Sequence, residues 1–292
     1  MSKSVKSASG KTVMAIAFTV FMLYCLFILF FLVFAILLAI KPSSQSFIAD
    51  KMAVRLFSWP EGATLRNFYL SFEQFTIGTH SYIEMLFNSI WRSLGGTFIG
   101  WFFTAMVTYI LVFFRCRFTK FVYALGFFLS TFPLYGAGPA EYRLYTQLGF
   151  INSPLILLNG ITLYGAYFFY MYAFWKGLSW GYAEAAMIDG AGNYTIFFRI
   201  MFPMAVPSMA ALFIMSFISN WNNYDGTLLY MTEYPNLSYA LYAYENSTKY
   251  NSQMGKPAYF AGLIISIMPS LILFLAFQNT IMERVYLGGL KG

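Results

Sequence analysis

The chain has 292 residues, of which 59% are hydrophobic and only 10% are charged, and its mean hydropathy is +0.62. This composition excludes an ordinary water-soluble globular protein and predicts a protein of the lipid bilayer. The net charge of +7 does not predict a nucleic-acid partner, because the sequence offers no clustered basic groove or stacking platform. With a single histidine, His80, and two cysteines in unlike settings, Cys25 and Cys116, we expect neither a metal site nor a disulfide framework.

Six apolar stretches are long enough to cross a hydrocarbon core about 30 Å thick as α-helices. The first ends in Lys41-Pro42 and not in the small residues of a signal-peptide cleavage site, so we expect it to persist in the mature protein. A tail, residues 1–12, precedes a single transmembrane domain, residues 13–292. The predicted fold is all-α, with spans at 13–40, 86–114, 121–142, 155–175, 205–230 and 258–277.

The basic residues predict the orientation of these spans. With a cytoplasmic N-terminus, the inner segments are 1–12, 115–120, 176–204 and 281–292, and they hold ten of the 18 basic residues but only three acidic ones. The whole net charge of +7 then lies on one side, as the positive-inside rule requires of a cytoplasmic face. An even number of spans places both termini in the cytoplasm.

The long inner segment 176–204 has the pattern of a helical hairpin. Ala185 and Ala186 favour a helical turn with an apolar face, Gly190 allows the backbone to bend, and the apolar pattern restarts at Phe197. Pro203 marks the start of the next span. We therefore predict two short helices joined by a glycine turn, a rigid element that can fit a groove on a partner protein and transmit motion.

The residues of this hairpin resemble the cytoplasmic signature of ABC-importer permeases: E-A-A, three residues, G, nine residues, I, one residue, L, P. The departure is Phe202, where leucine is usual; the matches are Glu184, Ala185, Ala186, Gly190, Ile200 and Pro203. Six matched positions at the right spacing, in the loop where the topology requires them, make the resemblance specific. The simpler alternative is an amphipathic hairpin lying at the membrane interface.

The resemblance covers nearly the whole chain and extends to the carbohydrate-uptake branch, in particular to the smaller membrane subunit of maltose-type importers. It is carried by Asn88-Ser89, by Leu-Gly-Phe-Ile-Asn-Ser at 148–153, by Trp-Asn-Asn-Tyr at 221–224 and by the C-terminal residues 288–292. The chain departs from the family at Asp225-Gly226, where an apolar-proline pair is common, and at Arg284, where glycine is frequent. These departures leave the identity of the solute open.

The resemblance implies a type I ABC importer permease fold in the bacterial cell membrane and assigns roles to two segments. The hairpin would form the coupling helix that docks on an ATPase, through Glu184, Ala185, Ala186, Asp189, Gly190, Ala191 and Pro203. The C-terminal tail, 281–292, would reach the ATPase dimer interface through Gly289, Lys291 and Gly292.

The resemblance also implies the partners of the chain. These are a second, homologous permease subunit, two cytosolic ATPase subunits, an extracytoplasmic solute-binding protein, a sugar, most simply an oligosaccharide, and membrane lipid. The chain would hold no cofactor and no catalytic residue, because the partner ATPase binds ATP and Mg and performs the hydrolysis.

Two groups of residues are candidates for the solute pathway. Pro133 interrupts the third span, where freed backbone groups must face protein or a wet cavity, and Arg143 lies near its outer end. The fifth span places amides beside aromatic rings, which can bind sugar hydroxyls and stack on a sugar ring, at Asn220, Trp221, Asn222, Asn223 and Tyr224. Headgroup anchoring, interhelical amide bonds and an aromatic belt explain the same residues without a ligand.

Three other functions fit the composition. An ion-coupled secondary transporter lacks support, because the spans show no evident carboxylate or histidine relay and no inverted repeat. A polytopic membrane enzyme lacks a nucleophile-base or metal constellation. An ABC importer permease for a non-sugar solute remains open.

Overall fold

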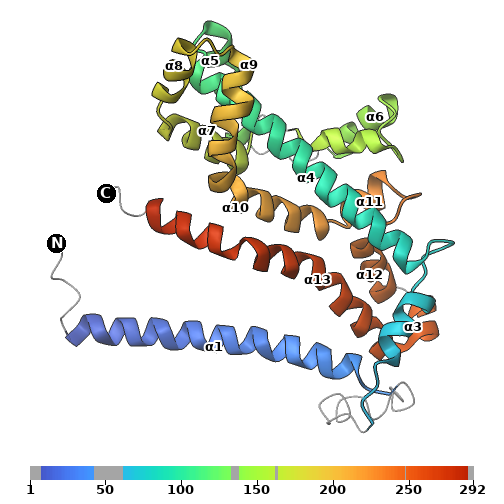
Figure 1. Cartoon of the computed structure of the whole chain (residues 1–292). Coiled ribbons are helices and arrows are strands. Elements are labelled where there is room, and N and C mark those ends of the chain that lie inside the picture. Colours follow the sequence, from blue (N-terminus) through green and yellow to red (C-terminus); the bar gives the residue numbers. More distant parts are fainter. Residues whose placement is uncertain (1–7, 43–61, 133–137, 162–163, 247, 289–292) are drawn as a thin grey trace. The chain divides into compact units, whose positions relative to one another are not determined.

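The computed structural model describes residues 8–42, 62–132, 138–161, 164–246 and 248–288, and they form helices almost throughout (Figure 1). The helices in chain order are α1 (Ala8–Ala39), α3 (Arg66–Gln74), α4 (Tyr82–Phe113), α5 (Arg117–Thr131), α6 (Gly138–Gln147), η4 (Pro154–Gly160), α7 (Ala166–Gly177), α8 (Gly181–Ile188), α9 (Asn193–Thr195), η5 (Ile196–Met201), α10 (Phe202–Trp221), α11 (Asp225–Tyr230), α12 (Leu237–Asn246) and α13 (Thr248–Gly288). Of these, η4 is a 3₁₀-helix and η5 a π-helix. In the described residues, β-structure is limited to one bridge between Ile77 and His80. The prediction of an all-α fold is confirmed.

The chain folds into two units. The first unit contains residues 1–82 and 244–266, and the second contains residues 83–243 and 267–292. The long helix α13 contributes residues to both. The candidate functional residues that the structure describes all belong to the second unit.

Among the described residues, three helices are long and apolar enough to cross a membrane: Lys11–Ala39, Tyr82–Phe113 and Lys256–Gln278. They overlap the first, second and sixth predicted spans. A fourth candidate, over the fifth predicted span, is a pair of helices, Asn193–Pro207 and Met209–Trp221, which meet at an angle of 73°. Pro207 lies at this bend, where its missing N–H interrupts the helical hydrogen bonds.

The third and fourth predicted spans, 121–142 and 155–175, are each divided. The third is divided between α5 and α6, and the fourth between η4 and α7. With 15 and 12 residues, α5 and α7 are about 22 and 18 Å long, less than the hydrocarbon thickness of about 30 Å. Pro154 begins the short 3₁₀-helix within the fourth span. The number of six spans therefore stays a prediction.

In the first unit, a side chain of α3 closes the end of α1. Asn67 is buried, and its amide nitrogen donates to the carbonyl oxygens of Ala39 and Lys41 at 2.6 Å each. A helix leaves its last carbonyl groups without partners inside the helix. The amide of Asn67 therefore satisfies acceptors that α1 itself cannot satisfy.

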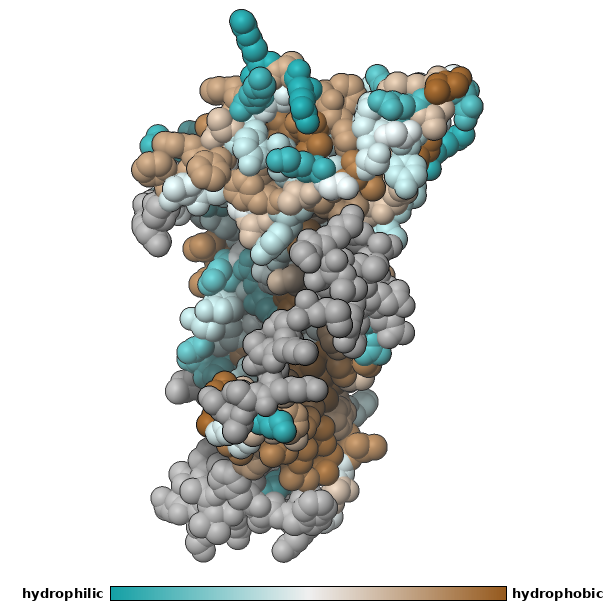
Figure 2. Space-filling view, turned by 90° about the vertical axis from the view of Figure 1, so that its left-hand side faces the viewer, coloured by the Kyte–Doolittle hydropathy of each residue, from teal (hydrophilic) through white to brown (hydrophobic). Residues whose placement is uncertain are grey.

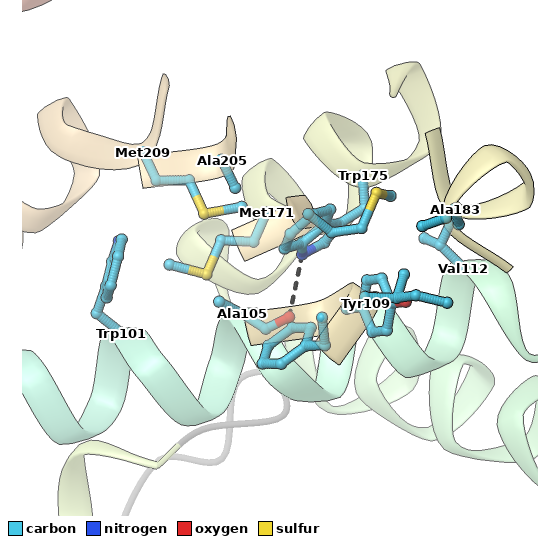
Figure 3. Close-up of a cluster of buried hydrophobic side chains, with 13 residues drawn as sticks. Trp101, Ala105, Tyr109, Val112, Met171, Trp175, Ala183, Ala205 and Met209 are labelled. Carbon is cyan, nitrogen blue, oxygen red and sulfur yellow. Dashed lines mark hydrogen bonds between the residues drawn. The ribbon is translucent and has the colours of Figure 1, made fainter. Parts of the chain in front are cut away.

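The second unit has a core of aromatic, aliphatic and sulfur-containing side chains (Figure 3). Its buried members are Trp101, Ala105, Tyr109, Val112, Met171, Trp175, Ala183, Ala186, Ile196, Phe197, Met201, Ala205 and Met209. The indole N–H of Trp175 donates to the carbonyl oxygen of Ala105 at 3.0 Å, shown as the dashed line in Figure 3. This bond joins α7 to the middle of α4 and gives a buried donor its partner.

Candidate functional site

The segment of residues 181–201, which we call the hairpin, turns at Gly190 as its sequence predicts. Gly190 has a φ of +81°, its N–H donates to the carbonyl of Met187 at 3.0 Å, and the N–H of Ala191 donates to the carbonyl of Ala186 at 2.9 Å. These two bonds form a Schellman motif, which ends α8. Glycine is favoured at this position because a side chain is strained at such a φ.

One face of the hairpin is buried in the core of the second unit. Ala183 and Ala186 of α8 and Ile196 and Phe197 of η5 are core residues. The ring of Phe197 packs against that of Tyr109 in α4, with 4.8 Å between the centroids. Because the core also includes residues of α7 and α10, close-packed side chains join the hairpin to these helices and to α4.

The opposite face of the hairpin is exposed and apolar at its tip. Ile188 is 87% exposed and Tyr194 is 84% exposed. Large apolar side chains left uncovered at the end of a rigid element suit a protein-docking surface. Figure 1 places α8 and α9 together with α5 at one end of α4, and Figure 2 shows hydrophilic side chains in teal at this end, at the top of the view.

The predicted coupling residues divide between the two faces. Those that are exposed around the turn are Glu184, Ala185, Asp189 and Gly190, whereas Ala186 is buried and Ala191 half-buried. Pro203 is exposed in the first turn of α10. Gly289, Lys291 and Gly292 lie outside the described residues.

A cavity of about 590 Å³, which we call the amide cavity, contains four of the five residues predicted from the fifth span. These are Asn220, Asn222, Asn223 and Tyr224. Other elements add Arg92 of α4, Glu141 of α6, Asn159 of η4 and Asp225 of α11. A lining rich in amides, with charged groups of both signs, suits a solute that carries many hydroxyl groups.

Hydrogen bonds to the protein hold these amides in place. Asn220 donates to the hydroxyl of Thr97 in α4 at 3.0 Å, and Asn222 donates to the carbonyl of Ile218 at 2.9 Å. The side-chain oxygen of Asn223 accepts the N–H of Gly226 at 2.8 Å. Each amide uses one of its two polar groups for these bonds, so the other group can serve a solute.

The charged side chains of the amide cavity are also held by the protein. The guanidinium of Arg92 donates to the hydroxyl of Thr227 at 2.5 Å. Burial raises the pKa of Tyr145, and a hydrogen bond with Glu141 raises it further, so this phenol stays protonated at neutral pH and can donate to the carboxylate. Within the described residues, no group of three His, Cys, Asp or Glu side chains could hold a metal ion.

The other two predicted pathway residues that the structure describes, Trp221 and Arg143, do not line the amide cavity. Trp221 is buried, its ring stacks on Phe217 with 5.7 Å between the centroids, and its carbonyl accepts a hydrogen bond from Ser238. Arg143 is exposed on α6, away from the cavity lining. Pro133 lies outside the described residues. Trp221 thus packs inside the protein next to the cavity-lining residues Asn220 and Asn222.

Glycines that shape the cavity wall are absent from the sequence predictions. Gly96 and Gly100 of α4 lie against Gly160 at the end of η4, and a Cβ added to Gly100 would lie less than 3.0 Å from the Gly160 backbone. Gly96 and Gly100 are four residues apart and therefore share one face of α4. This small-xxx-small spacing, typical of close helix contacts in membranes, is the signal that could have identified them.

A second cavity, of about 170 Å³, shares Gly96, Gly160, Ser219 and Asn220 with the amide cavity. Its lining adds Thr97, Trp101, Thr104 and Ser216. The indole N–H of Trp101 is buried and makes no hydrogen bond within the described residues. The polar lining of the amide cavity therefore continues along α4 and α10.

Asn88-Ser89, one of the motifs singled out in the sequence, holds the start of α4. Asn88 donates to the carbonyl of Pro235 at 3.1 Å, and the hydroxyl of Ser89 accepts the N–H of Leu237 at 2.7 Å. Both bonds reach the turn where α12 begins. The motif therefore has a structural role in joining two elements far apart in the sequence.

The motif at 148–153 ends α6 and ties it to a second turn. Gly149 has a φ of +69°, and the N–H of Phe150 donates to the carbonyl of Tyr145 at 2.9 Å, which is again the pattern of a Schellman motif. The N–H of Asn152 donates to the carbonyl of Tyr230, also at 2.9 Å. The end of α6 is thereby fixed beside α11. Tyr230 at the end of α11 lines the amide cavity, as does Glu141 in the first turn of α6.

No family model matches the chain. The chain is 28% identical, over 236 residues, to the diacetylchitobiose uptake system permease protein NgcG of Streptomyces coelicolor, a match that covers 80% of this chain and 76% of that protein. It is 26% identical, over 284 residues, to the arabinooligosaccharides transport system permease protein AraQ of Bacillus subtilis, covering 96% and 97%. Among solved structures it is similar to a bacterial ABC transporter involved in the import of the acidic polysaccharide alginate, with a TM-score of 0.73 and 18% identity over 94% of this chain and 98% of that one. At 18% identity, this last likeness concerns the fold.

Proposed function

We propose that this chain, a multi-pass membrane permease of the carbohydrate ABC importer family, moves an oligosaccharide across the bacterial membrane. Its family rests on similarity to sugar-importer permeases over most of the chain. The named relatives are permeases for diacetylchitobiose and for arabinooligosaccharides. A cavity of about 590 Å³ lined by amides supports a solute of this class.

In this proposal the hairpin couples transport to ATP. The observation that carries the mechanism is its two unlike faces, one packed in the core and the other ending in the exposed side chains of Ile188 and Tyr194. The exposed face docks on a cytosolic ATPase, with Glu184, Ala185 and Asp189 at the contact. Closure of the ATPases around ATP pushes the hairpin, and the buried face passes the motion to α4 and α10. The partner ATPase holds ATP and Mg, and this chain supplies no catalytic group.

The assembly needed for this mechanism is also part of the proposal. A second, homologous permease subunit completes the translocation pathway, two ATPase subunits supply the energy, and an extracytoplasmic binding protein delivers the sugar. The chain crosses the membrane six times, with both termini in the cytoplasm. Its transmembrane domain is 13–292, and Gly289, Lys291 and Gly292 of its C-terminal tail reach the ATPase interface.

The solute path follows the amide cavity and the second cavity. Asn220, Asn222 and Asn223 bind hydroxyl groups of the sugar, and Tyr224 offers an aromatic face. Tyr224 already stacks on Tyr242, with 4.3 Å between centroids and 10° between ring planes, so its orientation is set before a solute arrives. Preorganisation of this kind lowers the entropy lost on binding.

A charge reversal on the exposed face of the hairpin tests the coupling role. Glu184→Lys is expected to reduce ATP-driven uptake of labelled diacetylchitobiose or arabinooligosaccharides at least about tenfold, since rim charges at an interface set partner recognition. The same variant should lose co-purification with the ATPase. Glu233→Lys, an equal charge change at an exposed position outside the hairpin, should leave both unchanged. Full uptake and ATPase binding by Glu184→Lys would show that the coupling assignment is wrong.

A further inference from the structure

A third cavity, of about 360 Å³, lies where α4 ends and α5 begins, and we call it the basic cavity. Its lining contains three cations from separate segments: Arg115 from the α4–α5 loop, Lys120 from α5 and Lys176 from the last turn of α7. Within the part of the chain that the structure describes, no aspartate or glutamate lines it. Arg115, Lys120 and Lys176 are all exposed, so their charges are available to a ligand.

The walls of the basic cavity are ordered by contacts that do not involve a ligand. The rings of Tyr123 and Tyr172 lie 4.5 Å apart between centroids and form one wall. Buried Leu111 and Val112 of α4 form an apolar part of the lining. The hydroxyl of Thr119 donates to the carbonyl of Phe114 at 2.9 Å and so fixes the loop. The donors left for a ligand are the three cations and the two phenols.

The positive-inside bias explains why basic residues occur in these loops, but it does not explain their convergence. That bias requires charge near the ends of spans, on any side of the helices. Here three charges from segments up to 61 positions apart in the sequence surround one hollow with an apolar floor and phenolic walls. Such an arrangement suits an anion with an apolar attachment.

An apolar stripe on α5 and α7 continues from the basic cavity. It consists of Phe127 and Phe169, which lie four residues after Tyr123 on α5 and three residues before Tyr172 on α7, with 6.1 Å between their ring centroids. Residues at these spacings share one helix face with the tyrosines that line the cavity, and Phe127 is 57% exposed. An anion seated in the cavity would therefore have a lipid-compatible surface next to it.

We propose that the basic cavity binds the headgroup of an anionic phospholipid, whose acyl chains lie along the apolar stripe. Basic pockets between membrane helices on the cytoplasmic side are known to hold anionic lipid headgroups. Arg115 forks onto phosphate oxygens, Lys120 and Lys176 supply point charges, and the phenols donate hydrogen bonds. The inference rests on the membrane location of the chain and not on the solute that it carries. The apolar stripe favours a lipid over free phosphate.

The test measures lipid affinity of the intact importer assembly in mild detergent. Phosphatidylglycerol and phosphatidylcholine are titrated separately, and bound lipid is counted by native mass spectrometry. The variant Arg115→Gln, Lys120→Gln, Lys176→Gln removes three charges, each of which contributes about fivefold to affinity near an anionic headgroup. We expect phosphatidylglycerol binding to weaken at least about tenfold, with little change for phosphatidylcholine.

Two matched variants separate the site from general charge. Lys3→Gln, Lys6→Gln, Lys11→Gln removes the same charge from the N-terminal tail, on the same expected side of the membrane, and should retain phosphatidylglycerol affinity. Lys120→Arg, Lys176→Arg keeps all three charges and the fork of Arg115, and it should also retain the affinity, which shows that the cavity tolerates substitution. Equal loss in both neutralised variants would overturn the proposal.

Two further outcomes would also overturn it. Displacement of phosphatidylglycerol by inorganic phosphate at equal concentration would identify the ligand as a free anion. The variant Arg115→Gln, Lys120→Gln, Lys176→Gln could also lose the co-purifying ATPase while its lipid affinity stays unchanged. That result would identify the basic cavity as a protein-docking site. Because uptake is not the readout, failure of this proposal is distinguishable from failure of the proposed transport function.

Discussion

At the scale of single residues, the turn of the hairpin depends on one backbone conformation. A Cβ added to Gly190 would meet no heavy atom within 4 Å, so space does not explain why glycine stands there. The φ of +81° explains the glycine, because an L-residue with a side chain is strained in the left-handed region. Two residues later Gly192 has an ordinary φ of −77° and equally open space.

This contrast predicts different results for the same substitution. Gly190→Ala should destabilise the protein by about 1 kcal/mol, lowering the midpoint of thermal unfolding by about 2–4 °C, and should reduce ATP-driven uptake because the docking tip shifts. Gly192→Ala should change neither. Thermal unfolding of the purified protein and uptake by whole cells provide the two measurements. Equal effects of the two substitutions would contradict a special role for the Schellman turn.

At the scale of elements, the contact between α4 and η4 allows little freedom. The close approach of Gly100 to the Gly160 backbone leaves no room for a methyl group, and backbone cannot move aside as a side-chain end can. On the same helix, a Cβ at Gly95 would meet the side chain of Leu157, at 3.0 Å from its nearest atom. Leu157 can change its rotamer to accommodate the methyl group.

We therefore expect Gly100→Ala to be costly and Gly95→Ala to be tolerated. Gly100→Ala should destabilise the protein by about 1–3 kcal/mol, the usual cost of overpacking, and should lower sugar uptake because η4 moves at the boundary between the two cavities. Gly95→Ala should keep uptake near the normal rate. Thermal unfolding and uptake kinetics distinguish the two. Normal stability and uptake in Gly100→Ala would contradict the close contact.

The elements that the sequence predicted correctly are those whose determinants are local. The hairpin turn follows from alanines, a glycine and a proline within 20 residues, and long apolar runs predict α1, α4 and the apolar part of α13. An interruption of the third span is predicted from Pro133, whereas the division of the fourth span is not, because average hydropathy does not register how η4 packs on α4. The lining of the amide cavity was predicted only in part. Residue type alone does not show that the side chain of Trp221 is buried among other side chains, whereas that of its neighbour Asn222 lines the cavity. Contacts such as that of Asn220 with Thr97, 123 positions away, cannot be read from local pattern.

At the scale of the whole molecule, the proposed function depends on which side of the membrane the hairpin faces. Cys116 can report that side. It lies in the loop after α4, and the ring of Phe113 at the end of α4 stacks on Trp180, just before α8, with 4.8 Å between centroids. The loop and the hairpin are therefore at the same end of the second unit, and they must face the same compartment.

Cys116 is also suited to labelling by its chemistry. It is exposed, and it caps the N-terminus of α5. The backbone N–H of Thr119 donates a hydrogen bond to its sulfur, which lowers the pKa of the thiol. Because thiolate is the reactive form, labelling should proceed faster at neutral pH than for an ordinary exposed cysteine, and the rise in rate with pH should occur at lower pH.

In a Cys25→Ser variant, which leaves Cys116 as the single thiol, a membrane-impermeant maleimide should label inside-out vesicles and leave intact cells unlabelled. Permeabilised cells provide the positive control. The physical reason is the charge asymmetry: the segments predicted to be cytoplasmic hold the whole net charge of +7, and moving that many basic residues to the outer face opposes the positive-inside bias. Labelling of intact cells would place the hairpin outside, where no ATPase can reach it, and both the coupling role and the cytoplasmic headgroup site would be wrong.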